Sequence, residues 1–167
     1  ILVSIFVNPL QFSIDEDFEN YPRDLKSDYE IAAKSGANAV FAPSLEHIFP
    51  KDLETVQLKA SKLLKSNLCG SKRIGHFDGV VTVVARLLSL IKPKILILGE
   101  KDWQQLLIIR QLIQDLNLNV KLIGVATVRD KDGLAYSSRN NYLSTNERKQ
   151  ALALPQILKQ TTLEAKN

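Results

Sequence analysis

The feature that most constrains the fold is an alternation of short apolar runs with longer amphipathic stretches. We expect a strand at 94–98, where four apolar residues follow Lys94 and Gly99 comes next, and another at 120–125, which is apolar apart from Lys121 and Gly124. Between them, one face of residues 101–116 carries apolar residues at helical spacing: Leu106, Ile109, Leu112, Ile113 and Leu116. Two buried strands joined by a helix are typical of parallel pairing. This segment therefore predicts a strand–helix–strand unit of an α/β protein.

The same alternation extends over the rest of the chain. We expect strands at 1–7 and 38–42, a helix at 24–35 that Gly36 ends, and a helix at 77–91 that Pro93 ends. Between 44 and 75 we expect a short helix near 45–48, a strand near 54–59 and a helix near 60–66. The prediction is an α/β fold with helices on both faces of a mostly parallel sheet.

The C-terminal stretch predicts the start of a second domain. Ser144 and Glu147 have the capping-box spacing that opens a helix, and Pro155 should kink that helix or split it in two. We therefore place the first domain at 1–143 and the beginning of a C-terminal domain at 144–167.

The composition narrows the class of protein. With 45% hydrophobic and 24% charged residues, the 167-residue chain has the make-up of a globular domain. Its net charge of +4 is spread along the sequence, which argues against a nucleic-acid partner. No apolar run reaches the roughly 18 residues of a membrane helix, so we expect no membrane partner. Cys69 is the only cysteine, which rules out an intrachain disulfide and favours a reducing, cytoplasmic location.

Three polar clusters follow predicted strands. Residues 8–12 come after the first strand, 99–102 after the third, and 132–141 downstream of the fourth. Ligands of open parallel sheets bind beyond the carboxyl ends of the strands, so the clusters predict one site. The helix after Gly99 offers free N–H groups to a phosphate, and the Arg139 guanidinium suits phosphate or carboxylate. Taken singly, each cluster is more typical of an ordinary surface loop than of a ligand site.

The residues that commonly bind metals are sparse. His47 and His76 lie far apart and the chain has one cysteine, so the sequence predicts no zinc site. His76 precedes a helix, where it either caps the helix or contacts a ligand. Cys69 has no activating neighbour in the sequence, and we interpret it as unreactive.

Taken together and in this order, the clusters resemble the pantothenate synthetase family. The matching stretches are 3–12, 21–23, 41–44, 68–70, 75–80, 99–105, 127–129, 132–135, 137–140 and 142–144. The resemblance implies a Rossmann-like fold of the nucleotidyltransferase superfamily and a ligase that uses ATP with Mg²⁺. In the reaction that the resemblance implies, the carboxylate of pantoate attacks the α-phosphorus of ATP and releases pyrophosphate, and the amine of β-alanine then displaces AMP from the pantoyl adenylate. A homodimer is also implied.

The resemblance assigns roles residue by residue. The residues that it implies for pantoate binding are Gln11, Gln105, Asn8, Val83 and Val84. The residues that it implies for ATP binding are Gly99, Glu100, Lys101, Asp102, Val128, Tyr136, Ser137, Ser138 and Arg139. The residues that it implies for catalysis are Lys101, Arg139, Ser137 and Ser138, and it assigns no residue as a direct metal ligand.

The sequence also departs from the family pattern. The family carries a Met-Gly-x-Leu-His-x-Gly-His segment before the first strand, and that segment is not in this sequence. Tyr136 stands where we expect Met or Leu. We therefore expect this chain to be a piece of a longer protein and incomplete for activity by itself, and a fused kinase, as in some relatives, stays open. Two alternatives also remain, another adenylyl- or cytidylyltransferase of the same fold and a non-catalytic fragment.

Overall fold

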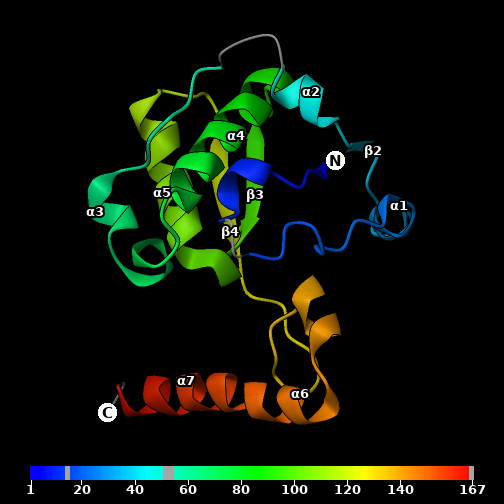
Figure 1. Cartoon of the computed structure of the whole chain (residues 1–167), viewed down its shortest axis with the longest axis vertical. Coiled ribbons are helices and arrows are strands. Elements are labelled where there is room, and N and C mark those ends of the chain that lie inside the picture. The colour runs from blue at the N-terminus through cyan, green and yellow to red at the C-terminus, as the bar shows by residue number, and fades with distance from the viewer. Residues whose placement is uncertain (14–15, 51–54, 166–167) are drawn as a thin grey trace.

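The structure is a computed structural model that describes residues 1–13, 16–50 and 55–165. Figure 1 shows the arrangement of the helices and strands. The elements follow in the order β1 (Leu2–Ser4), 3₁₀ helix η1 (Pro9–Gln11), α1 (Leu25–Lys34), β2 (Ala39–Phe41), α2 (Leu45–Ile48), α3 (Lys62–Lys65), η2 (Leu68–Ser71), α4 (His76–Ile91), β3 (Ile95–Gly99), η3 (Glu100–Asp102), α5 (Trp103–Asp115), β4 (Lys121–Val125), η4 (Ser138–Tyr142), α6 (Thr145–Ala151) and α7 (Ala153–Glu164).

The strands pair in parallel, as the sequence predicts. β1 pairs with β2, and β3 pairs with β4 with Ile95 opposite Lys121 and Gly99 opposite Val125. Among the described residues, the two pairs form separate two-stranded sheets. The predicted strand–helix–strand unit is confirmed, because α5 joins β3 to β4. The result is a mixed α/β fold with parallel strands.

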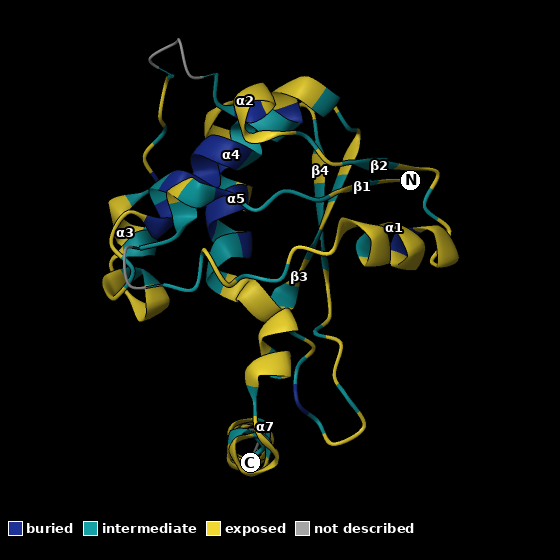
Figure 2. Cartoon of the chain, turned by 45° about the vertical axis from the view of Figure 1, so that its right-hand side comes forward, coloured by how far each residue is buried: buried dark blue, intermediate teal, exposed yellow. Residues whose placement is uncertain are grey.

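The core lies around α4, which Figure 2 shows as the most continuously buried helix. Phe77 and Val80 of α4 pack with Ile109 of α5 in one cluster of buried residues. Leu96 and Leu98 of β3 pack against the same cluster from the sheet. The alternate residues of β3 face away from these helices and are exposed. α4 and α5 therefore pack against each other, and the cluster they form packs on the side of the sheet where Leu96 and Leu98 lie.

The strand predicted near 54–59 is wrong for residues 55–59, which form no regular element; residue 54 lies outside the described residues. The backbone of this segment finds its partners on side chains of α4 instead. The Thr82 hydroxyl accepts from Leu58 N at 2.9 Å, and the Asp78 carboxylate accepts from Ala60 N at 2.8 Å. These bonds satisfy backbone groups that a strand would satisfy with another strand.

The C-terminal helices begin as predicted. Ser144 and Glu147 form a complete capping box at the start of α6. The predicted split is also confirmed, because α7 begins as a separate helix and Pro155 lies in its first turn, where a missing N–H has no helical partner to lose. Figure 1 shows α6 and α7 standing apart from the body that contains the strands. The boundary of a second domain at 143/144 stays a prediction.

Candidate active site

Segments that follow β1 and β3 and the segment before α6 converge on one polar cavity. Its volume is about 270 Å³, and it is lined by Gln11, Phe12, Tyr21, Arg73, His76, Lys101, Asp102, Gln105, Ser137, Ser138 and Arg139. The predicted site residues that meet here are Gln11, Lys101, Asp102, Gln105, Ser137, Ser138 and Arg139. A second hollow of about 340 Å³ shares Arg73, His76, Lys101, Asp102 and Gln105 with it. Two adjoining spaces therefore share one set of polar groups.

The turn that carries Gln11 is fixed against α4. Asn8 is only 2% exposed, and its side-chain amide donates to Gly79 O at 3.1 Å and to Gln11 Oε1 at 3.3 Å. Its side-chain oxygen accepts from Leu10 N at 3.2 Å. Gly79 lets η1 approach the helix, since a Cβ there would lie 2.2 Å from Leu10 O. Asn8 thus positions Gln11 by contacting its side chain and by tying its turn to the helix.

Arg73 and His76 also border the cavity. The sequence left His76 open between a helix cap and a ligand contact, and it gave Arg73 no role in the site. His76 is 7% exposed, and its Nδ1 lies 2.7 Å from the carbonyl oxygen of Gln11. Its Nε2 lies 3.0 Å from Nη1 of Arg73. A carbonyl only accepts and a guanidinium only donates, so the ring must carry its proton on Nδ1 and be neutral. Burial lowers the pKa of His76 below 6.5, which agrees with a neutral ring.

Arg73 is itself held by an acidic residue. Its Nε and Nη2 donate to the two carboxylate oxygens of Glu16, each at 2.6 Å. Nη2 also donates to Gln11 O at 3.3 Å. The hydrogen bonds from Arg73 lower the pKa of the Glu16 carboxyl. Arg73 and His76 therefore hold the backbone carbonyl of Gln11, and Glu16 holds Arg73, whereas Asn8 contacts the Gln11 side chain.

The other wall joins residues 17–21 to η4. Arg139 donates through Nε and Nη2 to Asp17 at 2.9 and 2.7 Å, and its guanidinium lies 5.1 Å from the Tyr21 ring centroid. Tyr142 donates from its hydroxyl to Asn20 O at 2.9 Å. The hydrogen bonds from Arg139 lower the pKa of the Asp17 carboxyl, which favours its ionised form. Two segments some 120 positions apart in sequence are thus joined beside the cavity.

Several predicted residues do not line this cavity. Val83 is buried in α4, and Val84 packs against the core cluster. Val128 and Tyr136 are 64% and 59% exposed, on the strand-like stretches around the Arg129–Ala135 bridge. Gly99 and Glu100 lie at the end of β3 and in η3, next to Lys101. Their roles in binding stay predictions.

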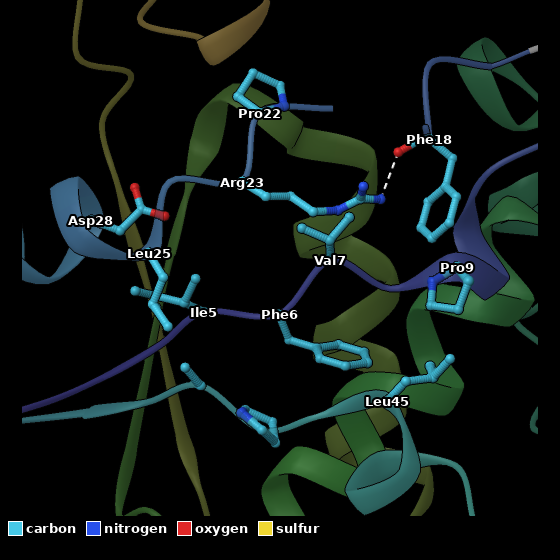
Figure 3. Close-up of a pocket in the computed structure, with 12 residues that line it drawn as sticks. Ile5, Phe6, Val7, Pro9, Phe18, Pro22, Arg23, Leu25, Asp28 and Leu45 are labelled. Carbon is cyan, nitrogen blue, oxygen red and sulfur yellow. Dashed lines mark hydrogen bonds between the residues drawn. The ribbon is translucent and has the colours of Figure 1, made fainter. Parts of the chain in front are cut away.

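A larger hollow of about 440 Å³ lies beside β1, α1 and α2, as Figure 3 shows. Its lining is mostly apolar, with Arg23 and Asp28 as the charged residues. Arg23 is already engaged, because it donates to Phe18 O at 2.6 Å and its guanidinium lies 4.6 Å from the Phe18 ring centroid. The polar cavity, where basic, amide and hydroxyl groups converge, is the better candidate for chemistry.

Over residues 1–13, 16–50 and 55–165, no group of three or more His, Cys, Asp or Glu side chains is placed to hold a metal ion. No helix in the same ranges has both the length and the apolar character needed to cross a bilayer.

The fold and the site define a class, a Rossmann-like α/β domain with a cationic cavity beyond the carboxyl ends of its parallel strands. Comparison with known families narrows this class. The family model described as pantoate-beta-alanine ligase matches residues 1–167, so the chain belongs to the pantoate-beta-alanine ligase family.

Relatives and solved structures agree with this membership. A bifunctional pantoate ligase/cytidylate kinase of Prochlorococcus marinus (strain MIT 9313) is 56% identical over 168 residues, which is 100% of this chain and 33% of the relative. The protein of the same name from Parasynechococcus marenigrum (strain WH8102) is 57% identical over 160 residues, 95% of this chain and 32% of the relative. The chain therefore spans about a third of the length of the curated relatives it matches.

Solved structures of two enzymes superpose closely on this chain. The pantothenate synthetase of Thermus thermophilus superposes with a TM-score of 0.90 at 45% identity, over 93% of this chain and 56% of that one. The pantoate-beta-alanine ligase of Francisella tularensis, solved in complex with beta-gamma ATP and beta-alanine, gives 0.87 at 40% identity, over 95% and 60%.

Proposed function

We propose that the protein containing this chain joins pantoate to β-alanine with ATP, through a pantoyl adenylate that releases pyrophosphate and then AMP. The observation that carries the proposal is the polar cavity, where two glutamine amides lie beside Lys101, Arg73 and Arg139. The reaction brings a carboxylate to a polyphosphate, and positioned cations offset the repulsion between the two anions. Membership of the pantoate-beta-alanine ligase family supports the same conclusion.

For the adenylation step we assign the phosphate contacts to Lys101, Arg139, Ser137 and Ser138. Lys101 provides a mobile charge, and the Arg139 guanidinium provides N–H donors in a fixed plane. The two hydroxyls can donate to phosphate oxygens. These groups act on charge that grows on the phosphate in the transition state, which is where electrostatic stabilisation speeds a reaction. Gly99, Glu100, Asp102, Val128 and Tyr136 are proposed to hold the remainder of ATP.

Pantoate is proposed to bind through the side-chain amides of Gln11 and Gln105. An amide both donates and accepts, so it can pair with a hydroxyl and with a carboxylate. Asn8 contacts the Gln11 side chain directly and restricts its orientation. Val83 and Val84 are proposed as apolar support in α4, the helix against which the Gln11 turn packs.

ATP is proposed to enter as its Mg²⁺ complex. Mg²⁺ is commonly held by substrate phosphates with one or two carboxylates, and Asp102 lines the cavity. The Francisella tularensis relative, solved with beta-gamma ATP and beta-alanine, supports the choice of both substrates. A cytoplasmic homodimer completes the proposal.

The names of the curated relatives also include a cytidylate kinase activity. All 167 residues match the ligase family, so we assign no cytidylate kinase group within this chain. Phosphorylation of CMP by the full-length gene product would be a property of other residues.

The test uses the full-length gene product with ATP, Mg²⁺ and pantoate, first without β-alanine. We expect radiolabelled pyrophosphate to exchange into ATP only when pantoate is present, because the adenylate forms reversibly. Adding β-alanine should then yield pantothenate and AMP in equal amounts. Exchange that depends on another acceptor would favour a different nucleotidyltransferase, and neither exchange nor product would overturn the proposal.

A further inference from the structure

We propose that Asp17 is a positioning residue that orients the Arg139 guanidinium toward the phosphates of ATP; this inference rests on the proposed function. Asp17 contacts the Nε and Nη2 edge of Arg139 at 2.9 and 2.7 Å. Among the described residues, Nη1 of Arg139 makes no hydrogen bond, and Arg139 lines the polar cavity. The carboxylate thus occupies one edge of the guanidinium and leaves Nη1 for a ligand.

The neighbouring pair, Glu16 and Arg73, has the same arrangement, except that Nη1 of Arg73 already makes a hydrogen bond. Glu16 contacts the Nε and Nη2 edge of Arg73, as Asp17 contacts that edge of Arg139. The Nη1 atom of Arg73 then donates to His76, a residue that lines the cavity. Two adjacent carboxylates therefore fix two arginines of one cavity by the same edge.

The surroundings of Arg139 restrict it further. Its guanidinium lies against the Tyr21 ring, with 5.1 Å between the guanidinium carbon and the ring centroid. The Ser138 hydroxyl donates to the Tyr21 hydroxyl at 3.4 Å, which links this ring to the neighbouring phosphate-site candidate. An arginine side chain loses much rotamer entropy when it is fixed, so orientation before ATP arrives lowers the entropic cost of binding. Asp17 and Tyr21 supply that orientation from two directions.

A competing interpretation makes the opposite prediction. If Asp17 only occupied the place of a phosphate, ATP would have to displace it, and loss of the carboxylate would strengthen ATP binding. If Asp17 orients Arg139, loss of the carboxylate weakens the transition-state contact. The sign of the effect separates the two.

The experiment is a double-mutant cycle in the full-length gene product with Asp17→Asn, Arg139→Ala and the double variant. The single-turnover rate of pyrophosphate release should fall by about 10- to 100-fold in Asp17→Asn, since small misplacements of catalytic groups cost on this order. The Kd for pantoate should stay within about twofold. In the Arg139→Ala background, Asp17→Asn should add less than about twofold, because Asp17 acts through Arg139.

Asp132→Asn is the matched control, since Asp132 accepts from Nε and Nη2 of Arg148 at 3.0 and 2.8 Å outside the cavity. It should leave the release rate unchanged. Faster release or tighter ATP binding in Asp17→Asn would overturn the proposal, as would an unchanged rate or an equal loss in both backgrounds. ATP affinity, measured by calorimetry without pantoate, keeps a failure of the Asp17 proposal distinct from a failure of the proposed function. If wild type binds ATP but never releases pyrophosphate, the proposed function fails. The coupling between Asp17→Asn and Arg139→Ala in ATP affinity would still decide the role of Asp17.

Discussion

Gly79→Ala tests whether close packing of η1 on α4 positions the site. A Cβ at this position would lie 2.2 Å from Leu10 O, 2.4 Å from Leu10 C and 2.8 Å from Gln11 N. All three are backbone atoms, so no side-chain rotation relieves the contact. Ordinary contact begins at 3.4 Å, and the turn must therefore move by about 1.2 Å (3.4 − 2.2).

The expected sign is opposite to that of helix propensity. In an exposed helix interior, replacing Gly by Ala stabilises by about 1 kcal/mol. Here overpacking costs about 1–3 kcal/mol, and displacing Asn8 from Gly79 O leaves a buried polar group unpaired at a cost of about 1–3 kcal/mol. Set against the gain of about 1 kcal/mol from helix propensity, these costs leave a net loss of about 3 kcal/mol, which lowers Tm by about 6–12 °C for a domain of this size.

The same displacement should impair activity. Moving the Gln11 turn by about 1 Å should reduce kcat/KM for pantoate on the order of 100-fold. Thermal unfolding of the full-length gene product gives Tm, and initial rates of pantothenate formation give kcat/KM. For stability, Gly99→Ala is the control, because a Cβ there meets nothing within 4 Å. A Gly79→Ala variant as stable as wild type, with kcat/KM within about threefold, would refute the packing argument.

The remaining predictions concern charge, substrate selection and pH. Lys101→Ala should slow single-turnover pyrophosphate release by about 100- to 1000-fold, whereas a loss below about fivefold would remove Lys101 from the mechanism. Gln11→Leu or Gln105→Leu should shrink the ratio of kcat/KM for pantoate over its deoxy analogues, because the unpaired amide that rejects those analogues is gone; an unchanged ratio in both variants contradicts the assignment. His76 stabilises the fold when neutral and has a lowered pKa, so its contribution is complete above pH 6.5 and is lost as the pH falls below that value. Tm measured from pH 7.5 to 5.5 should therefore fall less in His76→Gln than in wild type, and parallel curves would count against the neutral ring.

The parallel strands and the main helices could be predicted from local sequence. The β3–α5–β4 unit can be predicted because Leu96, Leu98 and Leu122 are partly buried against the core and the apolar residues of α5 recur at helical spacing. The start of α6 is equally local, since Ser144 and Glu147 complete their capping box within four residues. In such elements, the deciding interactions lie within one turn or one strand of the residues that make them.

Residues 55–60 show where local reasoning ends. Their composition allows a strand, but their backbone groups bond to Asp78 and Thr82, some 20 positions further along the chain. Asp78 also accepts from Lys65 Nζ at 2.6 Å, so one carboxylate organises two parts of this connection. Propensity gives no information about a partner of this kind, because the contact exists only after α4 has packed.

The residues of the site also separate into those that local sequence predicts and those that only long-range contacts reveal. Gln11, Lys101 and Arg139 follow strands or lie in polar clusters, and the rule for open parallel sheets is enough to group them. Arg73 and His76 lie before α4 and at its first residue, and only the folded chain brings them to the carbonyl of Gln11, 62 and 65 positions away. The available signal was a histidine at the start of a helix, which is compatible with a simple cap. The contact with Gln11 O requires a neutral ring protonated on Nδ1, and that requirement identifies His76 as support for the substrate-binding turn. Residues that face a ligand can thus be inferred from their place on a strand end, whereas those that hold them in place become visible only through their long-range partners.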